Sequence, residues 1–444
     1  MIFELGDGQG NAGLVFAVHP LATPLSSVTQ VAIGLRLCNN RVTSPGIRLL
    51  LHRDAFLTGH NGVTARIPPV LRVALRKFSR MLTLKFLPRF PLLTVALGIV
   101  FAGCARPDPT PGDSMQASAN SPKVDLTGAG ATFPYPLYSR WFNDYARRTN
   151  VRINYQSIGS GGGIRQVLAH TVDFGATDVP MTEEELASAN GAVEHIPTAL
   201  GAVAITYNLP EIKIPLRLSG DAVANIFLGH IKRWNDPRLQ ALNPDVVLPA
   251  RDILVVHRAD GSGTSYILSD YLSSVSAEWA MGPGRGKDVR WATGIGGKGN
   301  EGVAGQVKAM EGAFGYIEVV YARQNFLPVA HVRNKSGNFA SPQAHEISAA
   351  AASITDSLPG SSDFRVSLVN SSGADAYPIT SFTWLLLSPS SIGQVKTKQL
   401  TQFLRWALKD GEAVAGELGY VPLPAATARR VLARLDALDV PSQR

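Results

Sequence analysis

Val124-Asp-Leu-Thr-Gly-Ala-Gly-Ala-Thr132 is a short apolar run that enters a Gly-rich turn, and a helical stretch from Pro136 to Arg148 follows it. Two more Gly-rich turns, Gly159-Ser-Gly-Gly-Gly163 and Asp260-Gly-Ser-Gly-Thr264, also stand between an apolar run and a helical stretch. This alternation predicts an α/β fold with layers around a mostly parallel sheet. The three turns then lie at the carboxyl ends of strands, where such sheets bind ligands.

The same alternation continues toward the C-terminus. We expect strands at 124–126, 151–156, 173–176, 201–207, 253–257 and 384–388, and helices at 136–148, 163–170, 182–189, 221–228, 264–273 and 397–409. The part of the 444-residue chain that follows Cys104 exceeds the size at which single hydrophobic cores stop growing. Two domains are therefore expected in it.

The first 103 residues differ from the rest of the chain in charge. They hold eleven of the 42 Lys and Arg residues but only three of the 34 Asp and Glu residues. The net charge of +8 is therefore confined to them, and residues 104–444 carry 31 basic and 31 acidic groups. Because nucleic-acid binding needs clustered positive charge, we expect no nucleic-acid partner.

Residues 71–103 are typical of a lipoprotein signal peptide. A basic stretch from Arg72 to Arg89 precedes an uncharged run from Phe90 to Gly103, which is shorter than the roughly 20 residues that span a bilayer core. The run ends in Phe101-Ala-Gly-Cys104, which resembles the lipoprotein signal-peptidase box, so Cys104 is the predicted lipidation site. Residues 104–123 are rich in Pro, Ser, Asp and Asn and predict a flexible tether.

Residues 1–70 match no targeting pattern and show no sustained period. A signal peptide normally begins within a few residues of the start of its chain. We therefore expect translation to begin near Met81 or a little upstream, which makes residues 1–70 an extension of doubtful translation. The mature protein is expected to be periplasmic or otherwise extracytoplasmic and lipid-anchored to a membrane.

Each Gly-rich turn leads into a helix N-terminus, which leaves backbone N–H groups without partners and carries a partial positive charge. Three such termini on one chain predict a site for an oxyanion. The hydroxyls of Thr132, Ser160, Ser262 and Thr264 would add donors to those amides. Any one of these residues alone is more often an ordinary helix cap. The presence of three such turns on one chain is what favours an oxyanion site.

Two charged groups accompany these turns. The guanidinium of Arg258 can bind two oxygens of a tetrahedral anion while Asp260 holds it in place; the alternative is a surface pair worth under about 1 kcal/mol. Asp178 follows an apolar strand, and a carboxylate 4 Å from an anion is repelled by about 4 kcal/mol at an effective dielectric constant of 20. That repulsion disappears if the ligand brings a proton, as phosphate does and sulfate does not at neutral pH. Otherwise Asp178 is a helix or turn cap.

Six motifs in order resemble the periplasmic phosphate-binding protein of the bacterial phosphate-specific ABC transport system. They are Gly128–Pro134, Tyr155–Ser160, Thr171–Asp178, Arg258–Ser265, Gly296–Asn300 and Tyr377–Thr380. The resemblance runs from about Val124 to Arg444. It implies a two-lobed periplasmic-binding-protein fold of type II, with a central mostly parallel sheet in each hinged lobe. Residues 124–198 with 382–444 would form lobe I and residues 199–381 lobe II, so that the lobes exchange near Thr198 and Ser381.

The same resemblance implies the residues that contact phosphate, with Phe133 acting through its main chain and Asp260 as the salt partner of Arg258. The implied contacts are Thr132, Phe133, Ser160, Asp178, Arg258, Ser262, Gly263 and Thr264. It also implies inorganic phosphate and a membrane ABC permease as partners. We expect a monomer without a cofactor.

No catalytic motif favours an enzyme. Gly294–Gly299 satisfies the G-x-G-x-x-G pattern, but Lys287–Trp291 before it is a poor strand, which argues against a dinucleotide site. P-loop, nucleophile-elbow and metalloprotease motifs are absent, and the nine His and two Cys show no metal-ligand spacing. The alternatives left open are a binding protein for another tetrahedral oxyanion such as sulfate or molybdate, a phosphate-sensing paralogue, and a scaffold lipoprotein.

Overall fold

The computed structural model describes residues 124–189, 193–354 and 364–439, together with six short strands between Ile2 and Arg66. The chain divides into two compact units, Met1–Gly112 and Asp113–Arg444. The signal peptide, the tether and the lipidation site Cys104 lie outside the described residues. They remain predictions, as does the position at which translation begins.

The described strands of the first unit form two antiparallel sheets. One is a pair, and the other has the order β3-β4-β5-β6. These strands are β1 (Ile2–Leu5), β2 (Leu14–Ala17), β3 (Val31–Ala32), β4 (Arg48–Leu51), β5 (Phe56–Thr58) and β6 (Thr64–Arg66).

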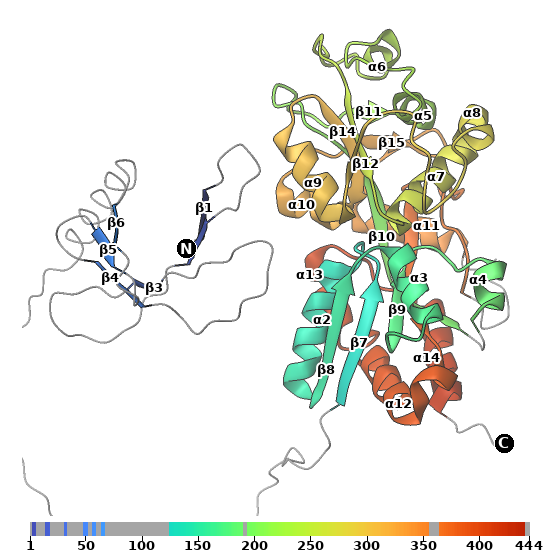
Figure 1. The fold of residues 1–444 in the computed structure, drawn as a ribbon. Helices are drawn as coiled ribbons and strands as arrows, with labels where there is room; N and C mark the ends of the chain where they lie inside the picture. The colour runs from blue at the N-terminus through green and yellow to red at the C-terminus, as the bar shows by residue number, and fades with distance from the viewer. Residues whose placement is uncertain are drawn as a thin grey trace, which may run out of the picture. The chain divides into compact units, whose positions relative to one another are not determined.

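An eight-stranded mixed sheet runs through the second unit in the order β13-β12-β14-β10-β17-β9-β7-β8 (Figure 1). Its strands are β7 (Val124–Gly130), β8 (Val151–Ser157), β9 (Phe174–Thr177), β10 (Glu194–Tyr207), β12 (Leu254–Arg258), β13 (Ile295–Gly297), β14 (Ala313–Glu318) and β17 (Thr380–Leu387). β7 is parallel to β8 and β9, and β12 is parallel to β13 and β14, whereas the other pairs are antiparallel. A separate small sheet contains β11 (Arg217–Leu218), β15 (His331–Arg333) and β16 (Phe339–Ala340).

The long strand β10 joins the two parallel halves of this sheet. Its residues 194–202 pair with β17, and its residues 203–207 pair with β14. All but its first residue are buried, as in strands that are covered on both faces. We call the part built on β7, β8 and β9 the first lobe and the part built on β12, β13 and β14 the second lobe. The predicted α/β class is confirmed, and the strands expected to form a mostly parallel sheet in each lobe are the two parallel halves of this one mixed sheet. The predicted exchange points Thr198 and Ser381 lie within β10 and β17.

Helices cover both lobes (Figure 1). Those of the first lobe are α2 (Tyr135–Arg148), α3 (Ser160–Leu168), α4 (Glu183–Ala187), α12 (Pro389–Ala407), α13 (Glu412–Leu418) and α14 (Ala425–Asp439). Those on or next to the second lobe are α5 (Gly220–Phe227), α6 (Pro237–Leu242), α7 (Gly263–Val275), α8 (Ala277–Met281), α9 (Gly299–Ala309), α10 (Val319–Asn325) and α11 (Ala344–Ala352).

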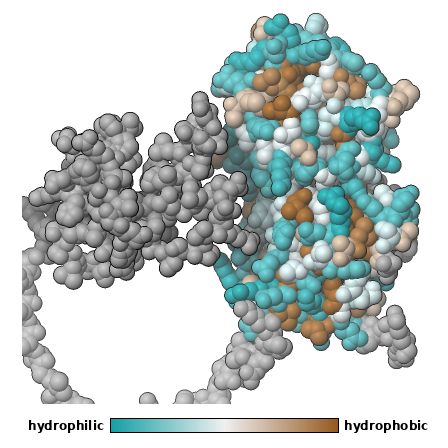
Figure 2. Space-filling model, in the orientation of Figure 1, coloured by the Kyte–Doolittle hydropathy of each residue, from teal (hydrophilic) through white to brown (hydrophobic). Residues whose placement is uncertain are grey.

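The helix α2 illustrates how these helices attach to the sheet. Leu137, Trp141 and Tyr145 recur every four residues and are all buried, so one face of the helix packs inward. Phe142 on the same side meets Phe403 of α12 with ring centres 5.3 Å apart. The visible outer face of the second unit mixes hydrophilic residues with small hydrophobic patches (Figure 2). In the described part of the chain, no helix has the length and apolar character needed to cross a membrane.

Candidate anion-binding site

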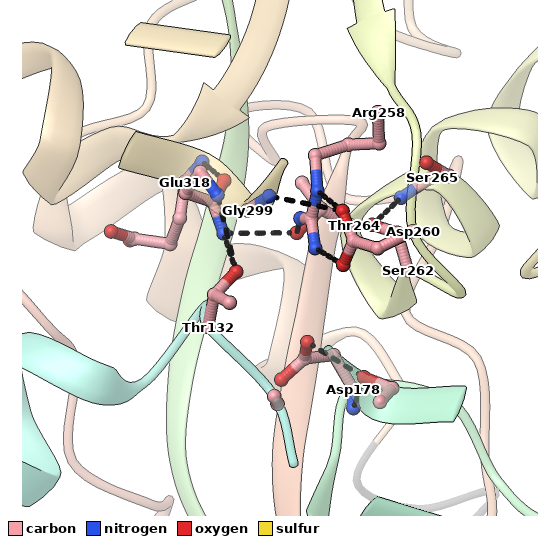
Figure 3. Close-up of polar contacts among 12 residues, drawn as sticks. Thr132, Asp178, Arg258, Asp260, Ser262, Thr264, Ser265, Gly299 and Glu318 are labelled. Carbon is pink, nitrogen blue, oxygen red and sulfur yellow. Dashed lines mark hydrogen bonds and ion pairs between the residues drawn. The ribbon is translucent and has the colours of Figure 1, made fainter. Parts of the chain in front are cut away.

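Loops from the two lobes converge on one place between them (Figure 3). The first lobe contributes Thr132 after β7, Ser160 at the start of α3, and Asp178 directly after β9. The second lobe contributes Arg258 at the end of β12 and Thr264 in the first turn of α7. The structure therefore brings together residues that are more than 130 positions apart in the sequence, with Thr132 and Asp178 facing Arg258 and Thr264 (Figure 3).

Glycines allow the two lobes to approach each other closely. The N–H of Gly161 donates to the carbonyl oxygen of Gly261 across the lobes at 2.9 Å. A Cβ atom at Gly263 would lie 2.4 Å from Oγ of Ser160 and 2.6 Å from Oδ2 of Asp178, which is closer than carbon and oxygen atoms can pack. Any side chain at residue 263 would therefore push the lobes apart.

Arg258 is a buried cation that three hydrogen bonds tie to two side chains. Its Nε donates to Oδ1 of Asp260 at 2.8 Å, its Nη2 donates to Oδ2 of the same carboxylate, and its Nη1 donates to Oγ1 of Thr264 at 3.0 Å. Burial alone would raise the pKa of Asp260, but the hydrogen bonds and the charge of Arg258, together with bonds from backbone N–H groups that include that of Gly299, hold the pKa below its ordinary value. The arrangement is a bidentate ion pair rather than a surface pair, because Arg258 is only 3% exposed.

Asp178 is a buried carboxyl group with two hydroxyl partners. Oγ1 of Thr383 donates to its Oδ1 at 2.8 Å, and Oγ of Ser160 lies 3.2 Å from its Oδ2. Burial raises the pKa of Asp178 to about 7, although the Thr383 hydroxyl, the Arg258 charge and the Ser160 hydroxyl all lower it. This carboxyl group can therefore gain or lose a proton near neutral pH.

Backbone N–H groups add uncharged donors. The N–H groups of Phe133, Ser160, Gly263 and Thr264 have no protein acceptor among the residues that the structure describes. Three of them lie in the first turn of a helix, where the helix dipole favours an anion. Oγ of Ser262 accepts from the N–H of Ser265 at 3.0 Å, so this residue caps α7 and keeps its hydroxyl proton for another acceptor.

Sequence reasoning missed two polar residues of the site. Thr383 of β17 bonds Asp178, and Asn300 of α9 bonds the hydroxyls of both Thr132 and Thr264. Asn300 ends the quoted motif Gly296–Asn300, which was a usable signal, whereas nothing in the apolar run around Thr383 distinguishes it from a core residue.

Two tyrosines hold the loop that carries Thr132. Oη of Tyr321 donates to the carbonyl oxygen of Thr132 at 2.6 Å, and Oη of Tyr420 donates to that of Phe133 at 2.7 Å. Because both carbonyl groups are held by hydrogen bonds, the orientations of the peptide planes that contain them are fixed. The direction of the Phe133 N–H is thereby set in this structure.

A cavity of about 360 Å³ has Asp178 in its lining. Glu183 of α4 and Tyr266 of α7 also line it, together with Arg285 and Arg365. The cavity therefore has charged side chains in its lining beside the buried carboxyl group of Asp178. Among the described residues no group of three or more His, Cys, Asp or Glu residues is arranged to hold a metal ion.

The fold and this donor set between two lobes are those of a solute-binding protein. A family model described as the PBP superfamily domain matches residues 117–410. The phosphate-binding protein PstS of Haemophilus influenzae is 46% identical over 310 residues, which are 70% of this chain and 90% of that protein. PstS of Xylella fastidiosa (strain Temecula1) is 41% identical over 345 residues, which are 76% and 94% of the two chains. The chain belongs to the family of PstS phosphate-binding proteins.

Solved structures agree on the fold. The phosphate-binding protein of Stenotrophomonas maltophilia gives a TM-score of 0.55 at 21% identity, over 70% of this chain and 94% of that chain. A high-affinity periplasmic phosphate-binding protein named PfluDING, solved with bound phosphate, gives a TM-score of 0.56 at 23% identity, over 70% and 93%.

Proposed function

We propose that this protein binds inorganic phosphate between its lobes outside the cytoplasm and delivers it to the ABC permease of a phosphate import system. One observation carries the proposal. A carboxyl group with a pKa of about 7, Asp178, stands among donors that all favour an anion: Arg258, free backbone N–H groups and hydroxyls. Membership of the PstS family supports the same conclusion.

The donors would bind the phosphate oxygens, and Asp178 would accept the proton that phosphate retains. Ser160, Phe133, Gly263 and Thr264 supply N–H groups, and the Arg258 guanidinium supplies charge. Sulfate has no proton to offer at neutral pH. An ionised Asp178 would then repel it by about 4 kcal/mol, which corresponds to roughly a thousandfold in affinity.

Binding is coupled to closure of the lobes in this proposal. The chain passes between the lobes in β10 and β17, and we propose that residues near Thr198 and Ser381 flex. Phosphate that bonds residues of both lobes lowers the free energy of the closed state relative to the open state. The closed form would then dock on the permease.

Calorimetric titration of the purified protein with phosphate and with sulfate tests this function. We expect one phosphate per chain at micromolar affinity or tighter and no heat from sulfate at pH 8. X-ray scattering with and without phosphate should report a smaller radius of gyration with the ligand. Silence toward phosphate would overturn the proposed ligand, and unchanged compactness would overturn the hinge.

Attachment to a membrane is a separate part of the proposal. We propose that Cys104 carries a lipid, that residues 104–123 act as the tether, and that the protein works as a monomer. Metabolic labelling with a radioactive fatty acid should mark the wild-type protein and leave Cys104→Ala unlabelled. Equal labelling of the two would contradict lipidation at this residue.

A further inference from the structure

The side-chain amide of Asn300 lies between two hydroxyls that belong to different lobes. Its Nδ2 donates to Oγ1 of Thr132 at 2.7 Å and to Oγ1 of Thr264 at 3.2 Å. Its Oδ1 accepts from the N–H of Glu318 at 2.8 Å. Asn300 is fully buried, so each of these bonds forms away from water. Both Nδ2 protons are thus used, one in a bond across the lobes to Thr132 and one in a bond within the second lobe to Thr264.

The backbone fixes which way this amide faces. The N–H of Glu318 needs an acceptor, and of the two terminal atoms of the amide only the oxygen can accept. Rotating the amide by half a turn would set an N–H donor against the N–H of Glu318 and leave both buried donors unsatisfied. Nδ2 must therefore point toward Thr132 and Thr264.

The two threonine hydroxyls consequently have their lone pairs occupied. Oγ1 of Thr132 accepts from Nδ2 of Asn300 and, at 3.3 Å, from its backbone N–H. Oγ1 of Thr264 accepts from Nδ2 of Asn300 and from Nη1 of Arg258. A hydroxyl has two acceptor lone pairs and one proton. Each proton is left to be donated, and neither has an acceptor among the described residues.

We propose that Asn300 is a positioning residue that forces the hydroxyls of Thr132 and Thr264 to act as donors to the bound oxyanion, and that it acts on Thr132 only when the lobes are closed. The inference rests on the proposed phosphate-binding function. Opening the lobes separates Thr132 from Asn300, and the hydroxyl is then free to rotate. Closure would therefore complete the donor set as well as exclude water.

Two variants of the full chain separate this role from a structural one. Asn300→Ala removes the amide, and Asn300→Asp keeps its shape but offers an acceptor that attracts the two hydroxyl protons away from the ligand. We expect phosphate affinity to fall about 10- to 100-fold in the first, as for lost bonds to a charged group, and further in the second. Asn243→Asp is the matched control, because this buried amide of the same lobe bonds only backbone atoms of Arg217 and Leu239. Its phosphate affinity should stay that of the wild type.

A double-mutant cycle supplies a readout that a structural role would not change. If Asn300 acts through the Thr132 hydroxyl, Asn300→Ala should cost clearly less affinity in a Thr132→Val background than in the wild type. If Asn300→Ala does not fold, Asn300→Ser takes its place in the cycle. Equal losses in the two backgrounds, or wild-type affinity in Asn300→Asp, would overturn the proposal. Failure of the wild type to bind phosphate would instead overturn the proposed function.

Discussion

The two lobes meet in two regions of contrasting character. At the centre, Asn300 bonds Thr132, and both residues are buried. At the rim, Lys287 forms an ion pair with Glu185 of α4, and their side chains remain 17% and 24% exposed. The central contacts involve the same groups that face the ligand, whereas the rim contact involves none of them. We therefore expect phosphate affinity and selectivity to depend on the centre, and the rim contact to affect only the closure of the lobes.

Removing the central cation should have the largest effect. Arg258→Ala leaves the carboxylate of Asp260 without its partner, and it takes away the one charge that faces the anion from this loop. Truncating one partner of a buried charge pair in a binding site costs about 2–5 kcal/mol of binding free energy, which corresponds to roughly 30- to 5,000-fold in phosphate affinity. Calorimetric titration measures the loss. A change of less than tenfold would show that the centre does not dominate.

The pH dependence of folding stability should be the next largest effect. The pKa of Asp178 is raised from 3.8 to about 7 in the folded state, so the folded protein holds a proton that the unfolded chain has lost between those values. The contribution of Asp178 to the free energy of unfolding is fully present below about pH 4. About 3–4 kcal/mol of it is lost as pH rises toward 7.

Urea unfolding of the phosphate-free protein at pH 5 and pH 7.5 measures that loss. Other buried carboxyl groups shift stability in the same direction, since burial also raises the pKa of Glu318. The informative quantity is therefore the free energy of unfolding of Asp178→Asn minus that of the wild type. This difference should increase as pH rises, because only the wild type loses stability through Asp178. A pH-independent difference would contradict the raised pKa.

A smaller effect is expected from Thr383→Val, which keeps the shape of the side chain but removes the hydroxyl that donates to Asp178. That bond lowers the pKa of Asp178, so its loss should raise the pKa further. Carbon-13 NMR titration of the Asp178 carboxyl group checks this. An unchanged or lower pKa would mean that Thr383 does not stabilise the carboxylate.

The rim should give the smallest effect. Glu185→Gln removes the charge that faces Lys287, while the amide oxygen can still accept from the N–H of Thr182. We expect a loss below about 1 kcal/mol in phosphate affinity that vanishes at high salt. Glu184→Gln, on the same helix, is the matched control and should change nothing at either salt concentration. A loss of tenfold or more would place the rim on a par with the centre.

Local patterns predicted much of the site. The strand, Gly-rich turn and helix order identified the loops that hold Thr132, Ser160 and Thr264, and these loops do meet. The bond between Asn300 and Thr132 could not be predicted from the sequence, because the two residues are 168 positions apart and only tertiary folding joins them. The partnership of Thr383 with Asp178, 205 residues apart, is of the same kind.

The fold was also predicted unevenly. The strand expected at 201–207 is the end of β10, which begins at Glu194. Pro197 disfavours a central strand because it has no N–H to donate, and the register shift between Pro197 and Ala199 shows how the ladder accommodates it. The buried strand β14 was not expected, because a six-residue apolar run has no periodicity that distinguishes a strand from a helix.

The ratio of phosphate to sulfate affinity between pH 6 and pH 8.5, measured for wild type and Asp178→Asn, tests the central claim most directly. Below its pKa of about 7 a protonated Asp178 can donate to sulfate, and above it the carboxylate repels sulfate but can still accept the phosphate proton. The wild-type ratio should therefore rise steeply with pH, whereas the ratio for Asp178→Asn should stay low and flat. A flat wild-type ratio, or the same rise in the variant, would contradict the role of Asp178 as acceptor of the ligand proton.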